Sequence, residues 1–536
     1  MTQGAGEPGR VVGNTAGVLD WIDQLAIRHE RAFFIAALSL FSLPVAYEAC
    51  TRPIWFDEFF TLVLSGLPTF SEMLKAMPAD GQPPLQYLLT RIALRFISEP
   101  EIAVRFPDIL AYLCTGMMTY RIVRKHGTQV QALFASVFIL GSAVTFIGGF
   151  TARPYALLVM FTTLTFWSWQ LAASGEKDRL LPLAGVSLGI GGAILSHHFG
   201  VLHVGILLAA GEAARLLRRW RVDWGMLVAA GTGLLPLIFT APMAHRSRAV
   251  LGEAVLHSAN FWAKPSMTTL AVSYGWMVNL PLLGALAGTV LLWRSRKGSL
   301  CLLELPGVPD YEWAATIGLC LLPVGILLFA EVETGYFLPR YAIGASLGLA
   351  LLTTWGLPRT RVLRARGQSL MLFSTLCCLV ALVAVAVRTE LKRPIAHARP
   401  GDGSMSRVLP AAPPGLSIVV ANAFDYVPEW FYAPQDIKSR LVYLTDVPYA
   451  QQQTDFLPEL SLAADRAYLP LKISSYTAFL VNHRRFLLLQ SGKHRLNWTV
   501  SRLVQSGGRL KALASSGSDV LYLVEMAGGS GAEGEK

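Results

Sequence analysis

The sequence has little charge and few cysteines for its length. Only 15% of its 536 residues are charged and 53% are hydrophobic, which leaves too little polar surface for a soluble protein of this size. The six cysteines form no CxxC pair and have no histidine at metal-binding spacing, so neither a disulfide framework nor a zinc site is indicated. The first thirty residues lack the apolar core and cleavage site of a signal peptide. We expect an integral membrane protein whose first apolar run stays as an anchor.

The net charge of +11 is not distributed as nucleic-acid binding requires. The basic residues fall in short clusters between apolar runs, rather than along one amphipathic face or in a tail. This pattern is typical of loops held at the negatively charged cytoplasmic leaflet. We therefore expect membrane lipids, and no nucleic acid, as partners of these charges.

Apolar runs of roughly the length that crosses a bilayer recur along the first part of the chain. They predict a polytopic α-helical membrane protein with about eleven transmembrane helices, near residues 32–50, 108–123, 130–150, 154–173, 180–196, 199–217, 224–241, 269–293, 313–331, 340–357 and 369–387. With a cytoplasmic N-terminus, every tight basic cluster falls inside, as the positive-inside rule requires. These clusters contain Arg121, Arg124 and Lys125; Lys177 and Arg179; Arg215, Arg218, Arg219 and Arg221; Arg294, Arg296 and Lys297; and Arg359, Arg361, Arg364 and Arg366.

This topology divides the chain into three parts. Residues 1–31 form a cytoplasmic segment, and residues 32–387 form the transmembrane domain, whose first outer loop covers about 51–105. The odd number of spans places residues 388–536 on the extracytoplasmic side. In this tail, short β-rich runs alternate with helix-like stretches, which predicts a small α/β domain. The β-rich runs are residues 416–424, 440–447, 485–490 and 519–526.

Within the tail, the segment DYVPEWFYAP (425–434) is rich in aromatic residues. Such side chains can stack on the rings of sugars. The alternative is that they form the aromatic face of a helix that packs on its own sheet.

Acidic residues gather in the first outer loop. Asp57 and Glu58 lie side by side in the apolar segment IWFDEFFTLV (54–63), and Asp80 lies on a turn just before Pro83 and Pro84. A partly desolvated carboxylate at the membrane face can have a raised pKa and act as a general base. The alternative is that these are ordinary solvated acids of a loop.

Basic and aromatic residues occupy the predicted outer ends of later spans. Arg153 and Tyr155 begin one span, His197 lies between two others, and Arg340 and Tyr341 begin a fourth. An arginine offers a planar fork of donors that suits a phosphate, and a tyrosine adds another. Alternatively, the arginines only reach lipid headgroups and the histidine only packs, although His197 together with Asp80 could hold a divalent metal.

These residues resemble the polyprenyl-phosphate-sugar-dependent glycosyltransferases of the GT-C class, close to the bacterial protein O-mannosyltransferase-like group and to the transferases that add aminoarabinose to lipid A. The motifs occur in the order and at the spacing of that family. They are WFDE at 55–58, DGQPPLQYLL at 80–89, ARPYALL at 152–158, SHHFGVL at 196–202 and LPRYAI at 338–343.

The resemblance implies roles for the motif residues. Asp57 would be the general base that deprotonates or aligns the acceptor hydroxyl, with Glu58 as its neighbour in the acidic pair. Arg153 and Arg340 would stabilise the departing lipid phosphate, assisted by the tyrosines that follow them, Tyr155 and Tyr341. The sugar would be transferred with inversion and without a covalent intermediate.

The chain departs from the family at one position. Relatives often carry a basic residue or a histidine before the two prolines, and this chain has Gln82 there. Asp80 and Gln82 are expected to bind substrate at that turn, but the change to Gln82 puts a phosphate or metal contact there in doubt. No cofactor is predicted, although a divalent metal remains open because some relatives bind one.

We therefore expect a glycosyltransferase of the bacterial inner membrane. It would take a sugar from a polyprenyl-phosphate donor and transfer it to an extracytoplasmic glycan, lipid or protein. A transporter or flippase of lipid-linked sugars is the alternative, and would favour charges at the bilayer midplane and an inverted repeat. A scaffold that displays the tail is a third.

Overall fold

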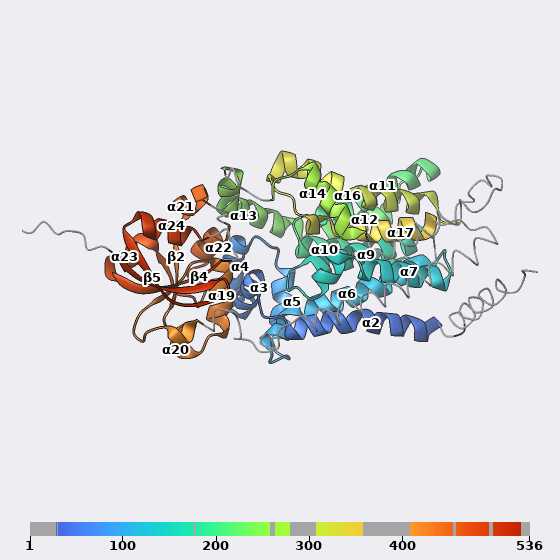
Figure 1. The fold of residues 1–536 in the computed structure, drawn as a ribbon. Coiled ribbons are helices and arrows are strands. Elements are labelled where there is room, and N and C mark those ends of the chain that lie inside the picture. Colours follow the sequence, from blue (N-terminus) through green and yellow to red (C-terminus); the bar gives the residue numbers. More distant parts are fainter. Residues whose placement is uncertain are drawn as a thin grey trace, which may run out of the picture.

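The computed structural model describes residues 28, 30–175, 178–257, 263–278, 307–356, 408–453, 457–492 and 497–526. An elongated helical domain is followed by a smaller domain built on a sheet, and the two lie end to end (Figure 1). The helices of the first domain are α2 (Glu30–Thr51), α6 (Pro100–Arg124), α7 (Gln129–Leu140), α8 (Ala143–Gly149), α9 (Tyr155–Ala173), α10 (Leu180–Ser196), α11 (Gly200–Arg219), α12 (Trp224–Leu234), α13 (Leu237–His257), α14 (Met267–Met277), α16 (Asp310–Phe329) and α17 (Ala345–Gly356).

Several of these helices have membrane-spanning character. Four are long and apolar enough to cross a bilayer, namely Phe34–Thr51, Tyr155–Ala173, Gly200–Arg219 and Asp310–Thr334, and the number reaches six if each of two bent pairs forms one span. The helical membrane-type fold is thus confirmed in outline, whereas the count of eleven stays a prediction. The expected span 369–387 and most of 269–293 lie outside the described residues.

Two expected spans are bent rather than straight. The 130–150 run divides into α7 and α8, which meet at 70°, and the 224–241 run divides into α12 and α13, which meet at 42°. Pro236 lies between α12 and α13, where its ring and its missing N–H interrupt a continuous helix. The bend between α7 and α8 brings the chain to the loop just before α9.

The first loop of the helical domain folds into three short helices, α3 (Phe56–Gly66), α4 (Phe70–Asp80) and α5 (Leu85–Ala93). The Thr69 hydroxyl accepts a hydrogen bond from the Glu72 N–H and begins α4 with a capping box. Gly81, in the left-handed conformation with φ 73°, ends α4 directly after Asp80. Asp80 is thereby held at a helix end, facing the turn that the two prolines stiffen.

The C-terminal domain contains a six-stranded sheet in the order β3-β2-β1-β4-β6-β5. The strands are β1 (Ile418–Val420), β2 (Leu441–Thr445), β3 (Ile473–Ser475), β4 (Arg485–Ser491), β5 (Gly508–Ser516) and β6 (Asp519–Met526). β1 to β4 pair in parallel, and β6 and β5 add antiparallel strands. The helices include α19 (Ala423–Tyr432), α22 (Leu457–Ala464), α23 (Tyr476–Asn482) and α24 (Trp498–Gln505). Residues 394–407, which precede this domain, lie outside the described residues.

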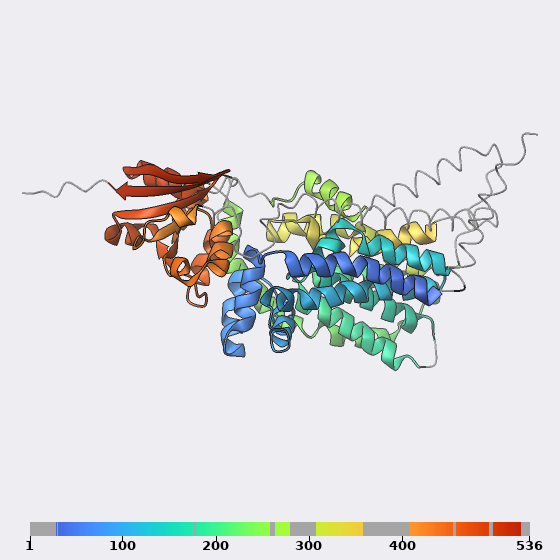
Figure 2. The ribbon, with the colours of Figure 1, turned by 60° about the horizontal axis from the view of Figure 1, so that its bottom comes forward.

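Helix α3 joins the two domains. Its phenylalanines Phe56, Phe59 and Phe60 recur at helical spacing and are at least 95% buried. They belong to the apolar core on one side of the C-terminal sheet, together with Tyr426 and Val427 of α19. Figure 2 shows the blue helices of the first loop between the orange and red sheet domain and the helical bundle. The helix that carries Asp57 and Glu58 is therefore packed against both domains.

Candidate active site

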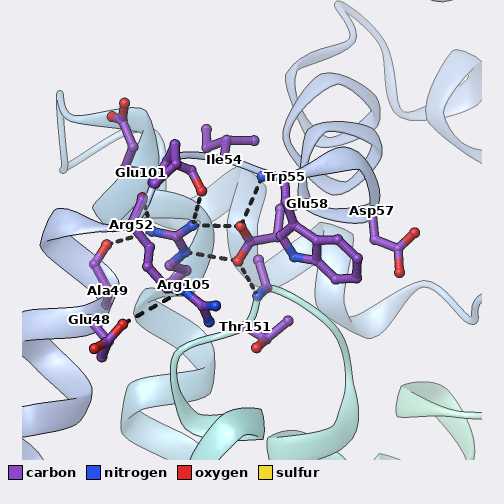
Figure 3. A network of polar contacts seen from close by, with 12 residues as sticks. Glu48, Ala49, Arg52, Ile54, Trp55, Asp57, Glu58, Glu101, Arg105 and Thr151 are labelled. Carbon is purple, nitrogen blue, oxygen red and sulfur yellow. Dashed lines mark hydrogen bonds and ion pairs between the residues drawn. The ribbon is translucent and has the colours of Figure 1, made fainter. Parts of the chain in front are cut away.

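Glu58 is enclosed in a network of hydrogen bonds around Arg105, which comes from α6 (Figure 3). The guanidinium Nε donates to Glu58 Oε1 at 2.8 Å, and Nη2 donates to Oε2 at 2.5 Å. Both side chains are only 1% exposed. The remaining donors of Arg105 bind the carbonyl oxygens of Ala49, Arg52 and Pro53 at 2.7 to 3.1 Å. Arg105 thus satisfies carbonyl groups at and beyond the C-terminal end of α2, which the helix itself leaves unpaired.

Glu58 also accepts two backbone hydrogen bonds. The N–H of Ala152 donates to Oε1 at 2.9 Å, and the N–H of Trp55 donates to Oε2 at 3.4 Å. The side chain therefore connects the start of α3 with α6, with the end of α2 and with the loop before α9. Both oxygens are bonded, so the geometry makes Glu58 a structural anchor for its neighbour.

Asp57 points away from this network (Figure 3). Successive residues of a helix are about 100° apart around its axis, so adjacent carboxylates face different surroundings. The Asp57 side chain is 23% exposed, and its Oδ2 lies 3.9 Å from Nε of Arg153. That separation is an ion-pair distance but is too long for a hydrogen bond. Asp57 keeps an accessible carboxylate beside a cation.

Arg153 is bonded to the other predicted acid. Its Nη1 donates to both oxygens of Asp80, at 3.0 and 2.8 Å, and the Tyr87 hydroxyl donates to the same carboxylate. Burial and the nearby Asp80 charge raise the pKa of Tyr87 well above its usual value, which keeps this hydroxyl protonated as a donor. The Nε of Arg153 is buried and has no hydrogen-bond partner among the described residues. The arginine that links the two acids therefore retains a free donor.

The second arginine, Arg340, packs against a cluster of aromatic side chains. The Arg340 guanidinium carbon is 5.2 Å from the ring centroid of Tyr155, which is in turn 6.3 Å from the ring of Tyr341. The ring of His197 is 5.6 Å from Tyr155 and 5.0 Å from Tyr341, and His203 Nε2 is 2.8 Å from the Tyr341 carbonyl oxygen. In the part of the chain that the structure describes, Nε of Arg340 and Nε2 of His197 are buried without partners.

The structure thus brings most of the predicted residues to one end of the helical domain. Arg153 forms ion pairs with Asp57 and Asp80. The neighbouring cluster contains Tyr155, His197, Arg340 and Tyr341, and the charge of Arg340 interacts with those of Asp57 and Arg153. Gln82 is on the turn after Asp80, and its Oε1 is buried without a partner within the described ranges. No hydrogen bond links Gln82 to the other described members of the site, so its predicted binding role stays a prediction.

Two residues that reasoning from sequence missed are Arg105 and Tyr87. Arg105 lies in the run EIAVRFPDIL, where an arginine with apolar residues on both sides is the only local signal. Tyr87 is within the DGQPPLQYLL motif, but its contact with Asp80 depends on the sharp turn between α4 and α5. Such partners come from different turns or helices, and residue spacing does not reveal them.

The site does not have the composition of a metal centre. No three His, Cys, Asp or Glu side chains within the described ranges come together as a cation would need. Both oxygens of Asp80 accept hydrogen bonds from Arg153, so a guanidinium already occupies the carboxylate that a cation would need. The residues present therefore do not fit the divalent metal that the resemblance left open.

The aromatic segment 425–434 forms most of α19 and packs on its own sheet, as the alternative predicted. Tyr426 and Val427 are buried in the apolar core on one side of the sheet, and Tyr426 stacks on Tyr443 at 5.4 Å. The same helix also contacts the first loop. Phe59 of α3 lies 5.9 Å from Trp430 and 6.2 Å from Phe431, measured between ring centroids, and the Tyr432 hydroxyl accepts a hydrogen bond from the Ile54 N–H at 2.8 Å. The segment therefore also joins the two domains, which the sequence did not predict.

Comparison with known proteins identifies what this arrangement is similar to. Residues 81–244 match the family model described as dolichyl-phosphate-mannose-protein mannosyltransferase. The fold is similar to that of ArnT from Cupriavidus metallidurans in the apo state, with TM-score 0.55 and 13% identity over 93% of this chain and 98% of that one. It is also similar to ArnT bound to undecaprenyl phosphate, with TM-score 0.53 and 14% identity over 92% and 97% of the two chains. No protein with a curated description matches the sequence.

These matches confirm the resemblance to the GT-C glycosyltransferases and, with it, the predicted class of enzyme, a glycosyltransferase. The segment matched by the family model includes Arg153 and His197. Asp57, Asp80 and Arg340 lie outside that segment, so their roles rest on the geometry described above.

Proposed function

We propose that this glycosyltransferase takes its sugar from a polyprenyl-phosphate donor of the undecaprenyl type and transfers it to a hydroxyl-bearing glycan, lipid or protein. The observation that carries the proposal is the open carboxylate of Asp57 next to Arg153, whose buried Nε has no partner among the described residues. A buried donor without an acceptor costs free energy in the folded chain, and a phosphate oxygen would satisfy it.

The reaction proposed is a single displacement. The acceptor oxygen attacks the anomeric carbon of the sugar and passes its proton to Asp57, while the bond between that carbon and the phosphate oxygen breaks. The electron pair stays with the lipid phosphate, whose growing negative charge is stabilised by Arg153 and Arg340. One attack from the opposite face inverts the anomeric centre, and no covalent intermediate forms on the protein.

The surroundings of the two arginines support this division of labour. Arg153 is fixed in direction by Asp80, and Tyr87 in turn fixes Asp80. Arg340 is held over the face of Tyr155, which stabilises a guanidinium without using its N–H groups. Both arginines are thus positioned before a phosphate arrives, so little ordering is needed at the moment of reaction.

The proposed location is the extracytoplasmic face of the bacterial inner membrane. Two described members of the basic clusters lie at the other end of the helices: Arg215 pairs there with Glu212 and Asp223, and Arg179 pairs with Asp223. If that end is cytoplasmic, the positive-inside rule is obeyed and the site faces outward with the C-terminal domain. This corresponds to the division into residues 1–31, 32–387 and 388–536.

The proposed base is tested with Asp57→Asn in the full-length chain, using a labelled polyprenyl-phosphate sugar and isolated cell-envelope acceptors. We expect transfer to fall by roughly 10²- to 10⁴-fold, which is the usual contribution of a general base. Glu99→Gln, a change at another acid of the same loop, is the matched control and should keep the wild-type rate.

A wild-type rate in Asp57→Asn would overturn the assignment of the base. Movement of the sugar headgroup across vesicles by the wild type, without transfer, would instead indicate a transporter of lipid-linked sugars.

A further inference from the structure

The C-terminal domain buries a carboxyl group next to the site. Asp465 directly follows α22 and is 1% exposed, and its Oδ2 has no hydrogen-bond partner within the described part of the chain. Helix α22 contacts α4 and α13 of the helical domain, and Figure 1 shows it at the junction of the two domains. Asp80 is the last residue of α4. The end of α22 therefore lies where the two domains meet over the site.

The residues after Asp465 fix this placement. Tyr468 packs against an apolar cluster that contains Met77 of α4, Tyr87 of α5 and Met243 of α13. The backbone N–H of Tyr468 donates to the Asp465 carbonyl oxygen at 2.8 Å, which forms a tight turn. The turn from 465 to 468 is thus seated on the pair of helices that presents Asp80 and Tyr87.

Electrostatic coupling also indicates that these groups are close together. Burial and the charge of Asp80 raise the pKa of Asp465 to about 8. The charge of Asp465 in turn helps to raise the pKa of Tyr87. Within the described ranges no hydrogen bond joins Asp465 to Asp80, which accepts hydrogen bonds from Arg153 and Tyr87.

A buried carboxyl oxygen without a hydrogen-bond partner destabilises the fold. Because Asp465 lies beside the proposed reaction site, we look for its missing partner in a ligand of that site. A neutral carboxyl offers one O–H donor together with acceptor oxygens. A sugar hydroxyl also donates and accepts, and it matches such a group without bringing a charge into a buried place.

We infer that Asp465 is a substrate-binding residue, supplied to the site by the C-terminal domain, that binds a sugar hydroxyl. The inference rests on the proposed function. The hydroxyl belongs either to the transferred sugar or to a sugar of the acceptor, and kinetics distinguish these two sources. On this account the C-terminal domain contributes one of the residues by which the site selects its substrate.

The test compares Asp465→Ala and Asp465→Asn with the wild type in the full chain. KM and kcat are measured while donor and acceptor are varied separately, and thermal unfolding of each variant is recorded. We expect Asp465→Ala to raise KM for one substrate about ten-fold, the effect of one lost hydrogen bond, with a smaller change in kcat. Asp465→Asn, whose amide still donates and accepts, should raise the same KM less. The substrate whose KM rises contains the bound hydroxyl.

Glu459→Gln is the matched control. Glu459 is another buried carboxyl of α22, but its Oε1 accepts hydrogen bonds from Tyr443 and Trp498 inside the C-terminal domain. We expect this variant to leave both KM values unchanged. The unfolding temperature of Asp465→Ala should equal or exceed that of the wild type, because the variant removes an unpaired buried group.

Unchanged KM values for both substrates in Asp465→Ala would overturn the inference. So would a lowered unfolding temperature with unchanged KM, which would indicate a structural role only. Absence of transfer by the wild type would overturn the proposed function itself, whereas transfer that depends on Asp57 but not on Asp465 would overturn only this inference.

Discussion

Two pairs of acid and arginine lie side by side around α3, and they differ in how completely they are bonded. In the Glu58–Arg105 pair, the five N–H groups of the guanidinium donate five hydrogen bonds, and both carboxylate oxygens are engaged. In the Asp57–Arg153 pair, the carboxylate is partly exposed, and Arg153 keeps a buried Nε without a partner among the described residues.

The comparison separates a structural site from a chemical one. The bonds of Glu58 and Arg105 are complete without a substrate, so a ligand would have to break them. The bonds around Asp57 and Arg153 are incomplete, so a ligand can add to them. Adjacent acids in one motif thus make different contacts, because the helix turns them toward different surroundings.

The largest expected effect on stability comes from breaking the closed pair. Glu58→Ala leaves the Arg105 charge buried without its carboxylate, and should lower the free energy of unfolding by about 3–5 kcal/mol. Thermal unfolding of the purified full chain measures this. Glu72→Ala, which removes the exposed carboxylate of the α4 capping box, is the control and should cost less, about 1 kcal/mol. Equal losses in the two variants would contradict the assigned anchor.

Weakening the open pair should change catalysis. Arg153→Gln removes a cation from the proposed phosphate position and should reduce kcat by roughly 10²- to 10³-fold, the usual effect of losing one such donor. Arg91→Gln is a suitable control: within the described part of the chain, Arg91 donates hydrogen bonds only to backbone carbonyl oxygens of the first loop, at 2.5 to 3.0 Å. Retention of kcat in Arg153→Gln would place the phosphate elsewhere.

The joint between the domains gives a smaller effect. Tyr432→Phe removes the acceptor of the Ile54 N–H and the donor to Glu101 at 3.0 Å. We expect a loss of about 1 kcal/mol in unfolding free energy, with KM and kcat nearly unchanged. Limited proteolysis of the folded protein should show faster cleavage between the domains. Unaltered proteolysis and stability would show that the aromatic packing of α19 alone holds the joint.

The last prediction concerns the pH dependence of stability. The pKa of Asp465 is raised to about 8, so the folded chain holds a proton that the unfolded chain releases near pH 4. The stabilising contribution of this protonation is present below pH 4 and is lost as pH rises through 8. Among the described residues, the titratable groups that interact with Asp465 are Asp80 and Tyr87.

Asp465→Asn should therefore flatten the pH dependence of the unfolding temperature between pH 4 and 8 relative to the wild type. Glu459, whose pKa is raised to about 7, contributes in the same direction and should be retained in both proteins. Parallel profiles for the two proteins would contradict the raised pKa of Asp465.

The sequence predicted the positions of helices and strands better than the bends within them. The apolar runs at 154–173 and 180–196 match α9 and α10 closely, because long apolar segments have few alternatives to helices. The apolar run at 224–241 was predicted as one straight helix, but the chain bends at Pro236. In the tail, strands occur at all four expected runs. β3 and β5 were missed because ISS is short and GRLKALASS carries charges and small residues that mask a strand pattern.

The site was predicted only in part, for a similar reason. Motifs indicated Asp57, Asp80, Arg153 and Arg340, since each lies in a short recognisable segment. The different surroundings of Asp57 and Glu58 depend on Arg105, which is 47 positions away in the sequence. The approach of Asp465 depends on the docking of two domains, which no local pattern specifies.

We propose that Asp57 does the chemistry while Glu58 holds it in place, and a paired measurement on two variants separates these roles. Asp57→Asn and Glu58→Gln are purified as full chains, and both the unfolding temperature and the transfer of a labelled polyprenyl-phosphate sugar are recorded. We predict that Asp57→Asn loses transfer and unfolds at the wild-type temperature, whereas Glu58→Gln unfolds at a lower temperature and keeps more transfer than Asp57→Asn. Wild-type transfer by Asp57→Asn, together with a complete loss of transfer by a stably folded Glu58→Gln, would contradict the account.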